Sequence, residues 1–189
     1  MFRSKYLAGA LLLALSGTAL ADKYNDTVAL FQNAGDSNAF FSSAYGYAVF
    51  PTIAKAGFGV GGARGKGKVF VRGKEVGDTT MTQLTLGFQI GGQGFSQIIF
   101  FEDARAFREF SSGNFEFGAN ASAVAITAGA SANASTAGAT AGASGGKRNA
   151  TTAGRSYYKG MKVFTIAKGG LMYEVSIGGQ KFSYRPYSS

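Results

Sequence analysis

Basic side chains occupy every second position in one segment of the sequence. Arg64, Lys66 and Lys68 alternate with Gly65 and Gly67. Residues two apart in an extended chain point to the same side, so this spacing predicts a strand with three cations in a row on one face. Glycine weakens a strand, and packing alone is therefore not expected to explain its choice behind the cations.

Two further cations follow in the same segment. Arg72 and Lys74 keep the same parity, although Arg72, Gly73 and Lys74 are also suited to a hairpin tip. Near an anionic membrane each cation contributes about 1 kcal/mol, an attraction that salt weakens. A solvated edge whose lysines prevent strand-on-strand pairing is the alternative. The candidate head-group-binding residues are Arg64, Lys66, Lys68, Arg72 and Lys74.

Residues for catalysis are scarce. The sequence has no His and no Cys, which removes His- and Cys-dependent nucleophile activation and the usual zinc ligands. Glu102 and Asp103 are the one adjacent pair of carboxylates, and the start of a helix explains them. A glycosidase built on carboxylates alone would be expected to line its sugar subsites with Trp, which is absent. We therefore expect no enzyme activity, no metal site and no cofactor.

Two glycine patterns imitate nucleotide-binding motifs. Residues 57–62 satisfy G-x-G-x-x-G, but the residues that follow have a period of two and no helical stripe, whereas a dinucleotide site needs a helix there. Residues 62–68 resemble a P-loop, but Val69 stands where a magnesium-binding Ser or Thr belongs. Both patterns are interpreted as structural glycines in strands and turns.

The N-terminal segment has the organisation of a cleavable secretory signal. Arg3 and Lys5 precede an apolar stretch over residues 6–15, and a small-x-small sequence ends at Ala21. The stretch is too short to cross a bilayer, although a retained membrane anchor is the alternative. We predict a signal peptide over residues 1–21, a single domain over residues 22–189, and export to the periplasm or to a peripheral membrane location.

The charge balance indicates the kind of partner. Of the 19 basic side chains two fall in the predicted signal, and only 10 acidic side chains oppose the rest. Such an excess favours anionic partners, and of these we expect an anionic phospholipid membrane surface and no nucleic acid. A solubility charge without a partner is the alternative. No later segment approaches 18 consecutive apolar residues, so no transmembrane helix is expected in the mature chain.

Hydrophobic spacing predicts short helices and many strands. Helices are expected over residues 22–33, 36–43 and 102–111, the second capped by Asp36. Strands are expected over residues 45–50, 57–75, 82–90, 96–101, 162–166, 171–177 and 180–184. Pro51 should mark an edge or bend, Gly77 and Asp78 a turn, and Gly178 with Gly179 the turn of a C-terminal hairpin.

Two of these segments carry more specific expectations. In residues 82–90, Leu84, Leu86, Phe88 and Ile90 share one parity and should form the buried face. Residues 118–146 consist of Ala, Gly, Ser, Thr and Asn, with small residues alternating in three runs; strands are expected up to about Ala134 and a loop beyond. The fold class is mainly β (α+β): an antiparallel β-sheet sandwich or barrel-like domain with two or three short helices.

Several segments form a recognisable series. In order, they are AYGYAVFP at 44–51, KAGFGVGG at 55–62, GFQIGGQ at 87–93, the predicted helix that carries Phe107, FGANAS at 117–122 and KGGL at 168–171. This series resembles the SYLF family, also called the Ysc84 actin-binding domain. The resemblance covers about residues 44–184. It implies a lipid-binding module, whose eukaryotic members bind phosphoinositides and, in yeast-like proteins, actin, and whose bacterial members are exported single-domain lipid binders.

This chain departs from the eukaryotic pattern. It has no SH3 domain, and its first predicted helix has only Lys23 as a cation, so a basic amphipathic membrane helix is not evident. Head-group contact is therefore assigned to the basic strand, and actin is not an expected partner of an exported chain. Two alternatives remain: a cell-envelope structural or protein-interaction module that uses residues 118–146 to contact itself or an envelope protein partner, and a carrier with an internal cavity for an apolar ligand.

Overall fold

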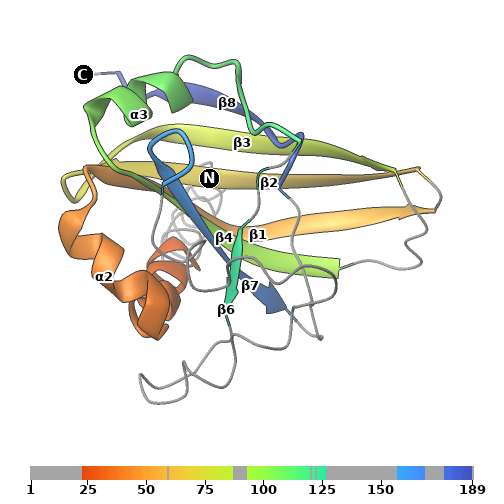
Figure 1. Cartoon of the computed structure of the whole chain (residues 1–189), viewed down its shortest axis with the longest axis horizontal. Coiled ribbons are helices and arrows are strands. Elements are labelled where there is room, and N and C mark those ends of the chain that lie inside the picture. Colours follow the sequence, from red (N-terminus) through yellow and green to blue (C-terminus); the bar gives the residue numbers. More distant parts are fainter. Residues whose placement is uncertain are drawn as a thin grey trace, which may run out of the picture.

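The computed structural model describes residues 23–58, 60–86, 93–119, 121, 123–126, 157–168 and 177–188. The strands in this part of the chain form one sheet with the order β5-β8-β3-β2-β1-β4-β7-β6 (Figure 1). The strands are β1 (Gly46–Phe58), β2 (Val60–Val71), β3 (Lys74–Leu86), β4 (Gln93–Phe101), β5 (Phe115–Glu116), β6 (Val124–Ile126), β7 (Met161–Lys168) and β8 (Lys181–Pro186).

The sheet is curled into a half-barrel. All strand pairs from β5 to β7 are antiparallel, and β6 joins the edge of β7 in parallel. The prediction of a mainly β, antiparallel domain with a few short helices is thus confirmed. Between the two architectures left open, a single curled sheet corresponds to the barrel-like one.

The three predicted helices are present. One covers residues 23–32, followed by α2 (Gly35–Ser43) and α3 (Ala104–Phe110). Asp103 caps α3, since its side chain accepts a hydrogen bond from the Ala106 N–H at 2.8 Å. The prediction that Asp36 caps α2 is wrong: Ala34 holds the N-cap position without a side-chain bond, and Asp36 lies in the first turn, where its charge still suits the helix dipole.

Pro51 does not end a strand. β1 continues to Phe58 as a central strand between β2 and β4, and its register against β2 shifts between Val49 and Thr52. Against β4 the shift lies between Phe50 and Ile53. A proline has no N–H for the ladder, and an irregularity of this kind accommodates it inside a sheet. The predicted bend is therefore a local bulge.

The β2–β3 hairpin turns at Arg72 and Gly73. Both residues have positive φ angles, 51° and 76°, as expected for a two-residue hairpin turn. The predicted turn at Gly77 and Asp78 is wrong, because β3 continues through them. The register against β2 shifts beside them instead, so that Val76 has no partner on β2.

The predicted buried face of β3 is also wrong where it can be compared. Met81 is fully buried, whereas Leu84 is 84% exposed. Gln83 takes the inward position, where its side-chain amide donates a hydrogen bond to the Gly178 carbonyl at 2.9 Å. A polar residue with a partner can thus occupy the core side. The side chain of Leu86 and residues 87–90 lie outside the described part of the chain.

The C-terminal turn exists without the predicted hairpin. The Gln180 N–H donates to the Ile177 carbonyl across Gly178 and Gly179. Within the described residues, however, Phe182 of β8 pairs with Met81 on one side and Phe115 on the other, so both edges are occupied. Residues 171–176 lie outside the described part, as do residues 120, 122 and 127–146 of the segment 118–146 on which the interaction-module alternative depends.

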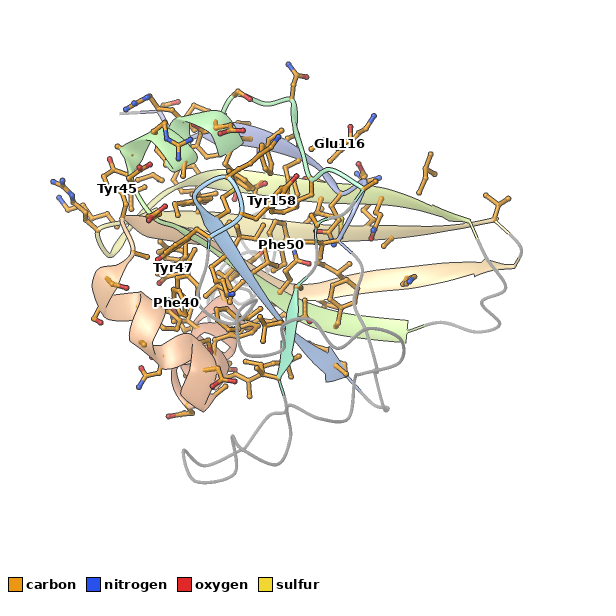
Figure 2. All side chains as sticks on the ribbon, viewed as in Figure 1. Phe40, Tyr45, Tyr47, Phe50, Glu116 and Tyr158 are labelled. Carbon is orange, nitrogen blue, oxygen red and sulfur yellow. The ribbon has the colours of Figure 1, made fainter. Side chains whose placement is uncertain are left out.

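Two apolar clusters stabilise the two faces of the sheet. The inner face, which carries Phe50, packs against α3 and β5 through side chains such as Ile53, Met81, Phe101, Phe110 and Phe182. The outer face packs against the first two helices through Phe31, Val49, Ile98, Phe100, Phe164 and Ile166. Figure 2 shows Phe40 and Tyr47 of this second cluster near α2. No helix among the described residues is both long and apolar enough to cross a membrane.

Candidate functional site

The three cations of β2 lie on one face, as predicted. Arg64 and Lys66 are exposed on the outer face and Lys68 is half-buried there, while Gly65 and Gly67 are buried on the inner face. The outer-face assignment follows from the register, which sets Val49 of the helix-covered cluster opposite Lys68. A row of cations on an extended backbone is therefore present.

The glycines between them have a packing explanation, contrary to expectation. A methyl group on Gly65 would lie 2.5 Å from Cγ1 of Ile53, and one on Gly67 would lie 2.6 Å from the ring of Phe50. Both distances are far below a van der Waals contact, so any side chain would displace the inner core. These glycines are required by the core behind the cations and carry no information about what the cations bind.

The sheet adds two lysines that sequence reasoning missed. Arg64 faces Ala54 on β1 and Thr82 on β3. The same row continues through Gly94 to Lys168 on β7, and on the other side to Lys181 on β8. Lys168 and Lys181 are both exposed. They come from strands about a hundred residues away, and no local pattern shows which residue of such a strand will stand in the row of Arg64.

Lys168 links this row to the next one. Its ammonium donates a hydrogen bond of 3.0 Å to the hydroxyl of Thr52, which is the register partner of Lys66. Desolvation lowers the pKa of Lys168, and the positive charge of Lys23 lowers it further. Lys23 thus adds to the positive potential at this place. We call the surface formed by Thr52, Ala54, Arg64, Lys66, Lys168 and Lys181 the bare half of the outer face.

Acidic partners on the bare half are few. Lys181 pairs with Glu116 at 3.4 Å, but both side chains are well exposed and such a pair is worth little. Neither Arg64 nor Lys66 has an ion pair or a side-chain hydrogen bond within the described part of the chain. Their charges are therefore available to an external anion.

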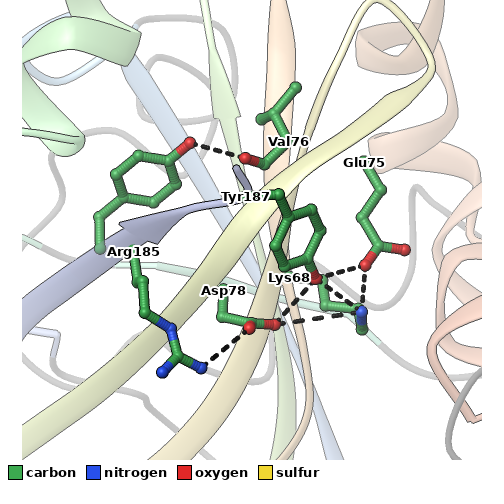
Figure 3. A network of polar contacts seen from close by, with 7 residues as sticks. Lys68, Glu75, Val76, Asp78, Arg185 and Tyr187 are labelled. Atoms are coloured by element: carbon green, nitrogen blue, oxygen red, sulfur yellow. Dashed lines mark hydrogen bonds and ion pairs between the residues drawn. The ribbon is translucent and has the colours of Figure 1, made fainter. Parts of the chain in front are cut away.

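Lys68 differs from its two neighbours because it is held in a polar network (Figure 3). Its ammonium forms an ion pair with Glu75, lies 4.0 Å from Asp78, and donates to the Tyr187 hydroxyl at 2.8 Å. Arg185 pairs with Asp78 at 3.3 Å. We call Lys68, Glu75, Asp78, Arg185 and Tyr187 the Lys68 network. Its two cations and two carboxylates cancel, so it offers no net attraction to an anion.

The network also changes the acidity of its members. Desolvation opposes the charge of Lys68, but hydrogen bonds to Glu75 and Tyr187 outweigh it and raise the pKa of Lys68. Desolvation and the bond to Glu75 raise the pKa of Tyr187 to about 12. The ammonium also lies 5.5 Å from the ring centre of Tyr24, on the first helix. Lys68 thus ties together two strands, the C-terminal tail and a helix.

Arg72 and Lys74 lie at the opposite end of β2 from the bare half. Arg72 is in the hairpin turn, with its guanidinium 5.5 Å from the ring centre of Tyr45, and Lys74 begins β3. Arg72 is eight residues from Arg64, roughly 25 Å along an extended strand. The structure therefore brings Arg64 and Lys66 together with Lys168 and Lys181. Arg72 and Lys74 lie away from this group of four cations.

Other kinds of site are not evident in the described residues. No group of three or more carboxylates that could hold a metal ion occurs among them. A hollow beside β5 is lined by Glu116, which is labelled in Figure 2, and by Phe117, Gly118, Ala119, Lys159, Gly178 and Gly179. The hollow is open to solvent and is not the internal cavity that an apolar-ligand carrier needs.

Comparison with known proteins gives one result. Residues 82–188 match the Ysc84 family, which is described as Las17-binding protein actin regulator. The match covers more than half of the chain and includes the end of β3 and all of β4 to β8. A search of curated proteins finds no match.

Proposed function

Because this chain belongs to the Ysc84 family, we propose that it is a non-catalytic domain that binds anionic phospholipid at a membrane surface. One observation carries the proposal: Arg64 and Lys66 stand side by side on an exposed face, without acidic partners in the described residues, and Lys168 and Lys181 extend their row. A row of cations on an exposed face suits a layer of anionic phosphates.

The expected strength is modest. At about 1 kcal/mol per cation, the four cations of the bare half contribute about 4 kcal/mol toward an anionic surface, and less as salt rises. Of the five residues that the sequence suggested, Arg64 and Lys66 keep the role of head-group contacts. Lys68 is neutralised by its network, and Arg72 and Lys74 lie too far away to act together with them.

The setting proposed for this activity is the cell envelope. The predicted signal peptide at residues 1–21 would place the domain in the periplasm or on a membrane facing it. The family description names Las17 binding and actin regulation. For an exported chain we do not carry these partners over, and a phospholipid surface takes their place as the proposed partner.

Vesicle co-sedimentation tests the proposal. We expect the protein to sediment with vesicles that contain phosphatidylglycerol or cardiolipin, to stay in solution with phosphatidylcholine alone, and to be released by salt. Equal recovery on neutral and anionic vesicles would contradict it.

Two charge-reversal variants locate the surface. Arg64→Glu with Lys66→Glu reverses the available cations, and Arg72→Glu with Lys74→Glu makes the same charge change at the other end of β2. The first variant should lose most of its binding to anionic vesicles, and the second should keep most of it. Circular dichroism of both variants checks that the fold is retained. Equal loss in the two variants would mean that net charge alone governs binding and that no particular surface does.

A further inference from the structure

Two large apolar side chains are exposed at one end of the outer face. Val60 is 64% exposed and Leu84 is 84% exposed. Leu84 stands opposite Gly62, and Val60 precedes Gly62 by two residues, so both point to the same side as Arg64 and Lys66. We call Val60 and Leu84 the apolar tip. The ends of β1, β2 and β3 that carry it project away from the helices, on the right in Figure 1.

Along the strands at this end, exposed apolar side chains are followed by exposed cations. The apolar tip comes first, then Arg64 one cross-strand row behind Leu84, then Lys66. Two residues of extended chain separate adjacent rows on one face, so Leu84 and Arg64 lie roughly 7 Å apart along the strands. An apolar element seated in a membrane interface is buried by about 5–10 Å at the boundary between head groups and acyl chains. The spacing therefore matches the distance from phosphates to the first acyl carbons.

We propose that this end of the sheet enters an anionic bilayer, with Val60 and Leu84 among the first acyl carbons and Arg64 and Lys66 at the phosphates. The inference rests on the proposed function and adds to it an orientation and an inserted depth. The strands approach the membrane by their ends. The Arg64 row with Lys168 and Lys181 lies at head-group level, while the Lys68 network and Arg72 stay in water.

A bilayer is the occupant that the observations favour. Two cations that have no acidic partner among the described residues stand directly behind the apolar tip, which complements anionic phosphates and would repel a second basic copy of this chain. In the part of the chain that the structure describes, the apolar tip consists of two side chains, far short of the roughly 800 Å² that each partner buries in a stable protein interface. A membrane needs no such area, since small apolar insertions and cations act together.

The absence of Trp from the sequence allows a direct depth measurement. We would prepare the single-Trp variants Leu84→Trp and Val60→Trp, with Ser112→Trp in the exposed turn after α3 as the matched control. Vesicles of phosphatidylglycerol and phosphatidylcholine would carry bromine on their acyl chains. Leu84→Trp and Val60→Trp should shift their emission to the blue and be quenched, while Ser112→Trp should sediment equally and show neither change.

A second variant measures the contribution of the apolar tip to binding. Leu84→Ser should weaken binding to anionic vesicles about tenfold, the cost of losing one buried leucyl side chain, and should leave the unfolding midpoint unchanged because Leu84 packs against little in the protein. Arg64→Glu with Lys66→Glu should abolish the quenching of Leu84→Trp along with the binding.

The outcomes separate this inference from the proposed function. Binding of Leu84→Trp to vesicles with emission as in water would overturn insertion and leave surface binding intact. No sedimentation of the unchanged chain would overturn both. A blue shift that grows with protein concentration in the absence of vesicles would assign the apolar tip to a second copy of the chain and overturn the bilayer as its occupant.

Discussion

The outer face of the sheet has two halves built from the same strands. On the covered half, the side chains are Tyr47 and Val49 of β1, Ile98 and Phe100 of β4, and Phe164 and Ile166 of β7, under the helix over residues 23–32 and α2. Further along the same strands, the bare half has Thr52 and Ala54, then Gly94, then Lys168. The bulge at Pro51 lies where β1 passes from one half to the other.

This difference shows what helix cover does to a sheet. Where helices lie on the strands, aromatic side chains interlock: Phe100 packs within 6.0 Å, centre to centre, of the rings of Phe40, Phe41, Tyr47 and Phe164. Beyond the ends of the helices the outer face is exposed to solvent, and its side chains are mostly polar. The bare half is mostly cationic, whereas the Lys68 network at the border has matched charges. The charges are balanced at the border and unbalanced beyond it, which favours an anion as the partner of the bare half.

The largest expected effect comes from comparing a truncation on the covered half with one in the apolar tip. Phe100→Ala removes a fully buried ring from the covered half and should lower the free energy of unfolding by about 3–5 kcal/mol. Leu84→Ala removes an exposed apolar side chain from the apolar tip and should change the free energy of unfolding by less than about 0.5 kcal/mol. Urea unfolding followed by circular dichroism measures both. Equal losses would mean that Leu84 is buried in solution.

A smaller effect on stability is expected when each of two glycines of β2 is replaced by alanine. Gly67→Ala places a methyl group 2.6 Å from the Phe50 ring and should destabilise the protein by about 1–3 kcal/mol. Gly62→Ala points to the outer face, where the nearest atom is the Gln83 carbonyl oxygen at 3.5 Å, and should be neutral or stabilise by a few tenths of a kcal/mol. Thermal unfolding of the two variants distinguishes them. Similar midpoints would refute the packing explanation for Gly67.

Local patterns predicted one strand of the site well. Alternation placed Arg64, Lys66 and Lys68 on one face correctly, because side-chain direction along a strand depends only on parity. The same rule could not say which face of β3 is buried. Gln83 lies inward beside buried Met81, where the Gly178 carbonyl, far away in the sequence, accepts its hydrogen bond, and alternation then places Leu84 outward.

What the sequence could not supply is register between distant strands. Lys168 and Lys181 join the row of Arg64 only through the pairing of six strands. The neutralisation of Lys68 likewise depends on Glu75 and Asp78, which stand on either side of the shift at Val76, while Tyr187 in the C-terminal tail accepts a hydrogen bond from it. Charge could be counted from the sequence, but whether a charge is already paired could not.

The smallest effect is expected on the stability that Tyr187 adds to the Lys68 network, at the border between the two halves, and it appears at high pH. The folded pKa of Tyr187 is raised from 10.0 to about 12, so the protonated hydroxyl is favoured by folding. The stability that Tyr187 adds should be complete below pH 10 and be lost as the pH rises toward 12. Tyr187→Phe should therefore be less stable than the unchanged chain at neutral pH, and the gap should narrow between pH 10 and 12. Lys68 acts in the same direction, since its pKa is raised as well.

Urea unfolding of the two chains at a series of pH values measures the gap, and Tyr158→Phe, outside the network, serves as the control. Tyr187→Phe keeps the ring and removes only the hydroxyl, so a gap that stays constant would mean that folding does not raise the pKa of Tyr187 and that the Lys68 network does not hold the hydroxyl. In that case the Tyr187 hydroxyl would not help to hold Lys68, and the charge of Lys68 would be balanced by Glu75 and Asp78 alone.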